Sequence, residues 1–195
     1  MARPKAFDRQ LVLEKAMETF WQKGYEATSV QDLLKAMGLN RGSLYDTFGD
    51  KRSLFLEAIA HYETNVVQTA IAKLEAPNAG KAAIVAHFRG LIERLESDRA
   101  RWGCLMTNVA VELCNQDTEA RTCIQRSLRR IEQAFVQALT HAQAQGEITP
   151  EADVEALACF LLCMMQGLRV VTKVSRDRQT LQNIVATTLS VLETA

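Results

Sequence analysis

Residues 28–56 read TSVQDLLKAMGLNRGSLYDTFGDKRSLFL, and this stretch decides the fold. Ser29 and Asp32 approximate a capping box, and Gly38 predicts the end of a helix of only about two turns. Asn40 is a preferred N-cap residue and predicts a second short helix directly afterwards. Two helices joined by so tight a turn cannot lie antiparallel, so the stretch predicts a helix-turn-helix.

The second helix of this stretch is expected to expose a small polar surface. Leu44 and Phe48 are spaced i, i+4 and are expected in the core. Bulky apolar side chains at the tip of a helix in the major groove would clash with base edges, whereas small or hydrogen-bonding residues fit. We therefore expect DNA contacts from Arg41 to guanine, from Gly42 by close backbone approach, from Ser43, and from the Tyr45 hydroxyl.

Two further positions are predicted to bind phosphate. Lys51 and Arg52 follow the N-cap Asp50, and a cation in the first turn opposes the helix dipole at a cost of ~0.3–1 kcal/mol. A DNA phosphate at that helix end would reverse the effect, because backbone amides and cations then favour the anion together. Lys51 is therefore predicted to anchor a phosphate together with Arg52, and Thr28 is predicted to bind another through its hydroxyl.

Composition places the chain among globular proteins with a balanced charge. Of its 195 residues, 48% are hydrophobic, which is ample for a core, while Lys plus Arg and Asp plus Glu both number 23. A mainly electrostatic polycation is thereby excluded. Residues 1–52 carry nine basic against seven acidic side chains, and residues 53–195 carry fourteen against sixteen. This weak N-terminal excess has the sign expected of a nucleic-acid-binding module.

Few turn signals interrupt the chain, which has three prolines and nine glycines and lacks strand-like runs. We expect an all-α fold of about nine helices, with an N-terminal domain over residues 1–49, a linking helix over about 50–74 and a larger helical domain over 75–195. Residues 1–7 are expected to form an arm that carries Arg3 and Lys5. The other helices are expected at about 8–23, 80–97, 103–115, 118–145, 151–175 and 177–193.

The helix expected at 151–175 is apolar on two sides. One side is a heptad seam, and the other contains Ala156, Cys159, Phe160 and Cys163. Such a helix must be covered on both sides, and a partner subunit is the expected second cover, with the last helix completing a four-helix interface. The interface is predicted to contain Leu157, Phe160, Leu161, Met164, Leu168, Leu181, Val185 and Leu192.

The cysteines, histidines and apolar runs indicate a reduced, cytoplasmic protein with no membrane span. Five cysteines form no CxxC pair, and the first residues are not a signal peptide. The most apolar run, 156–165, is shorter than the roughly 20 residues a span needs. Cys159 and Cys163 are one turn apart but lack further metal ligands, so we expect them to pack in an interface. No catalytic arrangement appears, and we expect neither an enzyme nor a metal or cofactor.

A longer segment, GYEATSVQDLLKAMGLNRGSLYDTFGDKRSLFLEAI, closely resembles the DNA-binding domain of TetR-type transcriptional regulators. The shared pattern is G-Y/F-x-x-T-S/T-V/I followed by G-x-x-x-G-S-L-Y-x-x-F-x-x-K-x-x-L-F, and the match covers about residues 8–62. The resemblance implies three DNA-binding helices, a linking fourth helix, a ligand domain and a homodimer on double-stranded operator DNA. It also implies DNA-contacting positions at Thr28, Arg41, Gly42, Ser43, Tyr45 and Lys51.

A second segment, WGCLMTNVAVEL at 102–113, is similar to the G-C-L-x-x-N-x-x-x-E-L segment of a branch of TetR-type regulators, some of which sense electrophiles or oxidants through cysteine. Cys104 is expected in the first turn of its helix, where the helix dipole and Arg101 would lower its thiol pKa. The alternative is that Cys104 only fills the core. Phe88 and Met106 are expected in the core, partly lining an apolar effector pocket.

These observations lead to the hypothesis of a homodimeric repressor that inserts residues 41–46 of each subunit into the major groove. A small-molecule, oxidant or electrophile signal would shift the population towards a geometry that no longer fits the operator. The helix over about 50–74 is the expected lever. The alternative is an all-helical small-molecule-binding protein without operator function, which salt-dependent binding to DNA would distinguish.

Overall fold

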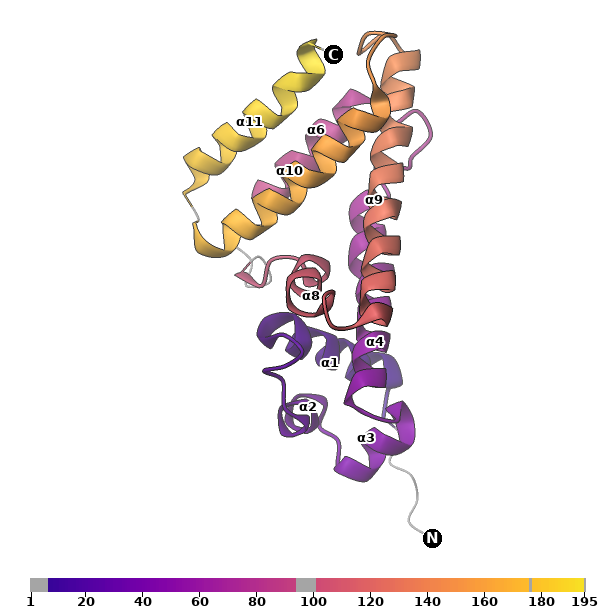
Figure 1. Cartoon of the computed structure of the whole chain (residues 1–195), viewed down its shortest axis with the longest axis vertical. Coiled ribbons are helices and arrows are strands. Elements are labelled where there is room, and N and C mark those ends of the chain that lie inside the picture. Colours follow the sequence, from indigo (N-terminus) through magenta and orange to yellow (C-terminus); the bar gives the residue numbers. More distant parts are fainter. Residues whose placement is uncertain (1–6, 94–100, 176, 195) are drawn as a thin grey trace.

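The computed structural model describes residues 7–93, 101–175 and 177–194. Every regular element in these ranges is helical, which confirms the predicted all-α fold. Figure 1 shows the N-terminal helices as a compact group at one end of an elongated molecule, with the last two helices at the other end. The predicted N-terminal arm with Arg3 and Lys5 lies outside the described residues.

The N-terminal helices begin and end at the residues that the sequence indicates. They are α1 (Arg9–Lys23), α2 (Val30–Met37), α3 (Arg41–Phe48) and α4 (Lys51–Tyr62). The capping box of Ser29 and Asp32 is present, and Gly38 adopts the left-handed conformation that ends α2. Asn40 accepts a hydrogen bond from the Ser43 amide at the start of α3, and Asp50 accepts one from the Ser53 amide at the start of α4. Local capping therefore fixes the angle between α2 and α3.

The core under these helices is made by side chains from α1, α2, α3 and α4. Leu44, Leu54 and Ala58 are completely buried, and the rings of Phe20 and Phe55 meet edge to face with centroids 5.0 Å apart. Burial of each large apolar side chain contributes about 1.5–3 kcal/mol. The helix-turn-helix is thus held on a packed support and does not depend on its two short helices alone.

The linking helix contains a π-helical turn that the sequence did not predict. After α4 the chain continues through the π-helix η1 (Glu63–Val67) into α5 (Gln68–Ile71). Tyr62 and Val67 are both buried although they are five residues apart, a spacing that an α-helix would turn to different faces. The π turn brings both onto the core side, so the predicted continuous helix is present but is wound differently in its middle.

The second half of the chain consists of longer helices that lie close to their predicted positions. They are α6 (Lys81–Glu93), α8 (Leu105–Leu113), α9 (Thr118–Ala144), α10 (Val154–Val174) and α11 (Arg178–Thr194). The predicted end of the helix at 80–97 lies partly outside the described residues. In Figure 1, α8 lies between α1 and the C-terminal end of α10, and α9 runs along most of the length of the molecule.

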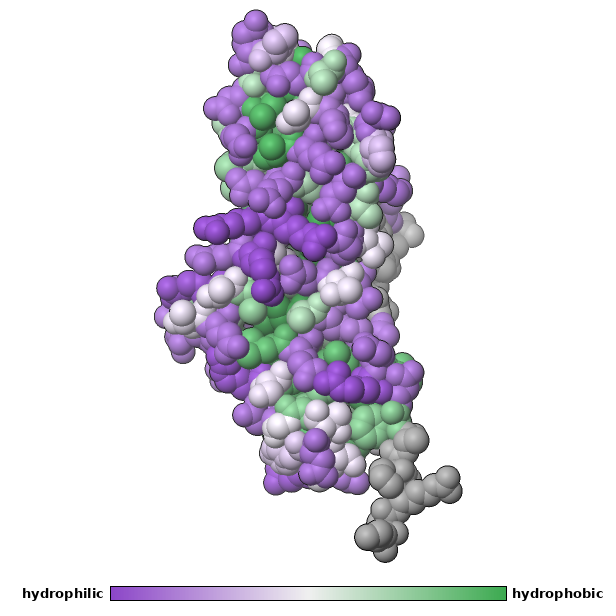
Figure 2. All heavy atoms as spheres, turned by 90° about the vertical axis from the view of Figure 1, so that its right-hand side faces the viewer, coloured by the Kyte–Doolittle hydropathy of each residue, from purple (hydrophilic) through white to green (hydrophobic). Residues whose placement is uncertain are grey.

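The outward face of α9 is hydrophilic. The guanidinium of Arg126 lies 3.7 Å from the carboxylate of Glu63, and that of Arg130 lies 3.9 Å from Glu75. These pairs join α9 to the linking helix. The side of the molecule that faces the viewer in Figure 2 is accordingly mostly hydrophilic, with small apolar patches between polar side chains.

The two apolar sides of α10 have different environments, and this corrects part of the predicted interface. Five of the predicted interface residues are buried inside the subunit, where a partner cannot reach them: Leu161, Leu168, Leu181, Val185 and Leu192. Leu157, Phe160 and Met164 retain exposed surface, and Phe160 is 38% exposed. Cys159 and Cys163 are exposed on the same outer face. Phe160 and Met164 line an open groove of about 520 Å³ against α11.

The length of α10 also differs from the expectation for its apolar run. Among the described helices, this 21-residue helix is long and apolar enough to cross a membrane by length and composition alone. The prediction that the run is too short for a span was therefore wrong in its premise. Core helices of soluble proteins meet the same criterion, and Leu161, Met165 and Leu168 of α10 are buried against the rest of the subunit.

Candidate nucleic-acid interface and buried thiol

The tip of α3 presents the polar surface that the sequence predicts. Arg41, Gly42 and Tyr45 are exposed, Tyr45 by 40%, whereas Leu44 and Phe48 on the opposite side are buried. Ser43 is half-buried, and its amide donates to the Asn40 side chain at 2.8 Å. Arg41, Gly42 and Tyr45 thus lie within the first five residues of α3 and are all exposed.

No contact or backbone conformation within the subunit requires a glycine at position 42. A Cβ atom built on it would meet nothing closer than Asn40 Oδ1 at 3.4 Å, and its φ is not positive. Gly38, in contrast, has φ +68° and is required by its own backbone conformation. A small residue at position 42 leaves room for a molecule that approaches α3 from outside, which agrees with the predicted close approach to DNA.

Lys51 is held beside the same surface by an aromatic ring. Its Nζ lies 4.3 Å from the centroid of the Tyr25 ring, and that ring in turn packs on Phe55 at 4.6 Å. The cation–π contact positions the ammonium without using its N–H donors. Lys51 also stands at the N-terminus of α4, so its ammonium and the backbone amides there can face one anion together.

Two predicted phosphate contacts near this surface are wrong. Thr28 is completely buried, and its hydroxyl donates to the Gly24 carbonyl at 2.6 Å, so it closes the turn between α1 and α2. Arg52 forms ion pairs with Asp117 at 2.9 Å and Glu119 at 3.0 Å. Arg52 therefore joins α4 to the start of α9 and is not free to bind DNA. Pairs this exposed stabilise only weakly, but they restrict where the two helices lie.

The segment before α8 connects the N-terminal helices to α10. The Gly103 carbonyl accepts a hydrogen bond from Trp21 Nε1 at 3.2 Å, and the Trp21 ring packs edge to face on Trp102 with centroids 5.4 Å apart. On the other side, the Asn108 carboxamide donates to the Trp102 carbonyl at 2.9 Å and accepts from Lys173 Nζ at 3.0 Å. Gly103, just before α8, and Asn108, within α8, thus both have structural roles at the junction between the N-terminal helices and α10.

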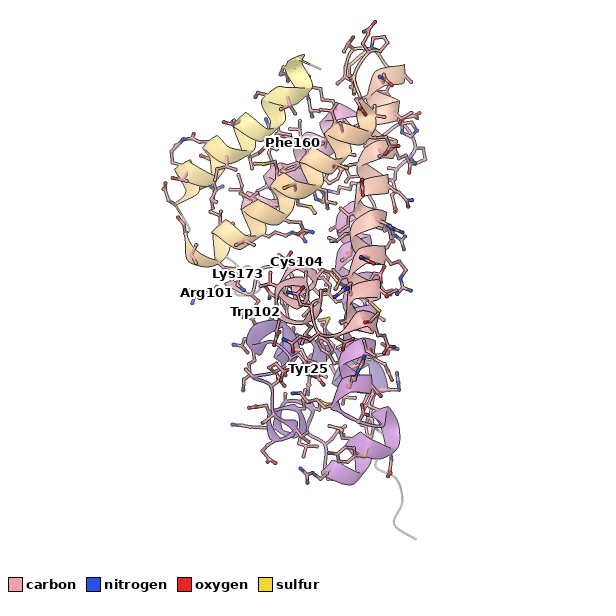
Figure 3. The ribbon with its side chains drawn as sticks, viewed as in Figure 1. Tyr25, Arg101, Trp102, Cys104, Phe160 and Lys173 are labelled. Carbon is pink, nitrogen blue, oxygen red and sulfur yellow. The ribbon has the colours of Figure 1, made fainter. Side chains whose placement is uncertain are left out.

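Cys104 lies at the centre of this junction. It is the N-cap residue of α8, is only 1% exposed, and accepts a hydrogen bond from Arg169 Nη1 at 3.0 Å. The Tyr62 hydroxyl lies 3.7 Å from the same sulfur. Figure 3 shows Cys104 beside Trp102, near the end of α10 that carries Lys173. One sulfur atom therefore touches side chains from both the linking helix and α10.

The charge of Arg169 changes the chemistry of this thiol. Burial acts to raise the pKa of Cys104, but the Arg169 guanidinium and hydrogen bonds with Thr107 and Tyr62 outweigh it and lower the pKa below the ordinary value. The thiolate in turn raises the pKa of Arg169 although burial opposes this. Among the described residues, no carboxylate pairs with Arg169. A lower thiol pKa increases the fraction present as the nucleophilic thiolate.

The structure differs from the predicted surroundings of Cys104 in two ways. The cation that contacts the thiol is Arg169 and not Arg101, which is exposed. Arg169 is 65 residues away in the chain, and no local sequence signal connects it with Cys104. Phe88 and Met106 are fully buried core residues, and neither lines the groove between α10 and α11.

Comparison with known proteins adds to this geometry. Residues 12–58 match the family described as bacterial regulatory proteins, tetR family, and residues 80–188 match the tetracyclin repressor-like C-terminal domain. The HTH-type transcriptional regulator YezE of Bacillus subtilis (strain 168) is 39% identical over 194 residues, which cover 99% of this chain and 100% of YezE. The chain belongs to the TetR family of transcriptional regulators.

Two further TetR-type relatives bear on the DNA-binding surface. The HTH-type transcriptional repressor ComR of Escherichia coli (strain K12) is 34% identical and covers 96% of this chain and 90% of its own. A cysteine mutant of the TetR family regulator CifR, in complex with 26-bp double-strand operator DNA, is 30% identical with a TM-score of 0.86, covering 96% of this chain and 98% of CifR. As a TetR-type regulator, the chain is a DNA-binding protein of a family whose members are generally not enzymes.

Proposed function

We propose that the chain is a homodimeric, cytoplasmic repressor that leaves its operator when the Cys104 thiol is modified by an electrophile or oxidant. In this proposal residues 1–49 bind DNA, and residues 75–195 sense the signal and form the dimer. The helices over 50–74 link these two parts. The relative ComR is named as a repressor, which supports this assignment. The exposed outer face of α10 around Phe160 supports the dimer, because it leaves apolar surface for a partner to cover.

On the operator, the first turn of α3 enters the major groove. Arg41 reads guanine through two hydrogen bonds, Gly42 allows the backbone to approach, and the Tyr45 hydroxyl reaches a phosphate. Lys51 holds a second phosphate at the N-terminus of α4. The exposure of these side chains on one face, over a buried Leu44, supports this mode of binding.

The observation that carries the sensing part is the 3.0 Å contact between Arg169 Nη1 and Cys104 Sγ. An activated alkene would be attacked by the thiolate: a carbon–sulfur bond forms, the π electron pair moves to the neighbouring carbon, and that carbon takes a proton from solvent. The neutral thioether removes the anion that faces Arg169, and the added group has no room at a sulfur that is almost fully buried. We expect α8 and α10 to separate as a result.

Titration with N-ethylmaleimide tests this proposal. Fluorescence anisotropy with DNA from the promoter region of the protein's own gene reports operator affinity for the wild type and for Cys104→Ser. The exposed Cys159 and Cys163 are replaced by serine in both proteins, so that only less accessible thiols respond. We expect the reagent to weaken DNA binding of the protein that retains Cys104 and not of Cys104→Ser. Equal weakening in both, or none in either, contradicts a sensing role for Cys104.

A further inference from the structure

The carboxylate of Glu112 on α8 caps the turn between α1 and α2. Glu112 Oε2 accepts a hydrogen bond from the Tyr25 amide at 3.1 Å, and Oε1 accepts one from the Glu26 amide at 2.8 Å. These are consecutive backbone N–H groups beyond the end of α1, and they bind one carboxylate through both of its oxygens. Hydrogen bonds to a charged acceptor are about twice as strong as those between neutral groups. A side chain from the sensing half thus holds backbone in the DNA-binding half.

The turn has a shape that accommodates this carboxylate. Gly24 has φ +85°, and a Cβ atom built on it would lie 2.9 Å from Glu112 Oε2. Glycine is therefore required there both by its own conformation and by the neighbouring carboxylate. On the other side of the turn, the Thr28 hydroxyl fixes the Gly24 carbonyl at 2.6 Å. The hydrogen bond that excludes Thr28 from DNA binding is thus part of the same arrangement.

The residue that Glu112 holds leads directly to the DNA-binding surface. The backbone of Tyr25 binds Glu112, and the ring of Tyr25 lies under the ammonium of Lys51. The same turn ends at Ser29, the N-cap of α2, whose direction determines where α3 lies. We propose that Glu112 is a positioning residue for operator binding, which holds the α1–α2 turn, and with it Lys51 and α3, in the orientation that binds DNA.

The place of Glu112 on α8 also provides a path for the signal, and this part rests on the function proposed above. Cys104 caps the N-terminus of α8, and Glu112 lies near its C-terminus, so one nine-residue helix carries both. In Figure 3, Cys104 lies above Tyr25. Displacement of α8 by an adduct on Cys104 withdraws the Glu112 carboxylate from the turn. Operator affinity then falls although no residue on α3 has changed.

The test compares Glu112→Gln with a matched control, Glu147→Gln. Glu147 makes the same kind of contact at the far end of the molecule, where its Oε2 accepts a hydrogen bond from the Lys81 amide at 2.7 Å. In Glu112→Gln, the side chain offers one acceptor and sets an NH₂ group against the second amide. Because loss of a charge-assisted hydrogen bond changes an equilibrium by about tenfold or more, we expect the operator Kd of the untreated variant to rise by about that factor. Glu147→Gln is expected to bind operator like the wild type.

Hydrogen exchange shows whether the contact itself was lost. The Tyr25 and Glu26 amides are expected to exchange faster in Glu112→Gln than in the wild type. Faster exchange with an unchanged Kd, or an equal loss of affinity in Glu147→Gln, overturns the proposal. If Glu112→Gln does not fold, Glu112→Asp, which keeps the charge on a shorter side chain, replaces it in the same comparison. These measurements use untreated protein, so they are independent of whether Cys104 reacts.

Discussion

Replacing Lys51 by alanine is expected to reduce the salt dependence of operator binding by a calculable amount. Each phosphate neutralised on B-DNA contributes about −0.9 to the slope of log K against log salt concentration. A dimer has two Lys51 side chains, and each is expected to neutralise one phosphate. Lys51→Ala should therefore make the slope less steep by ~1.8. Between 50 and 200 mM salt, the wild type should then lose about twelvefold more affinity than the variant.

The assay is fluorescence anisotropy with one operator duplex at four or five salt concentrations. Loss of the contact with the Tyr25 ring removes about 0.5–1 kcal/mol of stability, so the variant should still fold. Arg126→Ala is the matched control, because this cation on α9 has a side chain that is 67% exposed and pairs with Glu63, away from the helix-turn-helix. A slope for Lys51→Ala equal to that of the wild type and the control would refute a phosphate contact at Lys51.

Three other predictions concern base reading, assembly and the thiol. Arg41→Ala should cost about 1–3 kcal/mol at the operator and relax preference at one base pair, measured against single-base operator variants. Phe160→Glu should give monomers in sedimentation velocity; dimers at micromolar concentration would exclude the outer face of α10 as the interface. Alkylation of Cys104 by iodoacetamide, followed by mass spectrometry, should reach half its maximal rate below the pH typical of a free cysteine, and Arg169→Met should move the profile to higher pH. The pKa of Cys104 is lower in the folded protein than in the unfolded chain, where it is about 8.5. The ionised thiol therefore contributes to the free energy of unfolding above pH ~8.5, and this contribution is lost as the pH falls through the pKa of the folded protein.

The parts of the fold that depend on neighbours in the chain could be predicted from the sequence. The capping box at Ser29, the left-handed Gly38 and the N-cap Asn40 each act within four residues, so the pattern of residue types is sufficient to place α2 and α3. Heptad spacing likewise identified α10 and its two apolar sides. Spacing could not say which side faces the subunit core, and Leu161 and Leu168 proved to be the inner ones.

The parts that depend on distant residues could not be predicted. Arg52 was expected to bind phosphate with Lys51, but its partners Asp117 and Glu119 lie 65 and 67 residues further along the chain. The guanidinium beside Cys104 comes from Arg169 for the same reason, whereas its sequence neighbour Arg101 is exposed. Local sequence contains no information on such contacts, because they arise only when helices that are distant in the chain pack against one another.

Release of the operator by a single modified thiol can be measured by following adduct and DNA binding in the same samples. Intact-protein mass spectrometry with peptide mapping gives the fraction of Cys104 alkylated, and anisotropy gives the fraction of protein that still binds operator. If modification of Cys104 displaces α8, the binding-competent fraction falls in proportion to the Cys104 adduct as N-ethylmaleimide is added. Protein in which Cys104 is fully alkylated but operator affinity equals that of the untreated dimer would contradict this account.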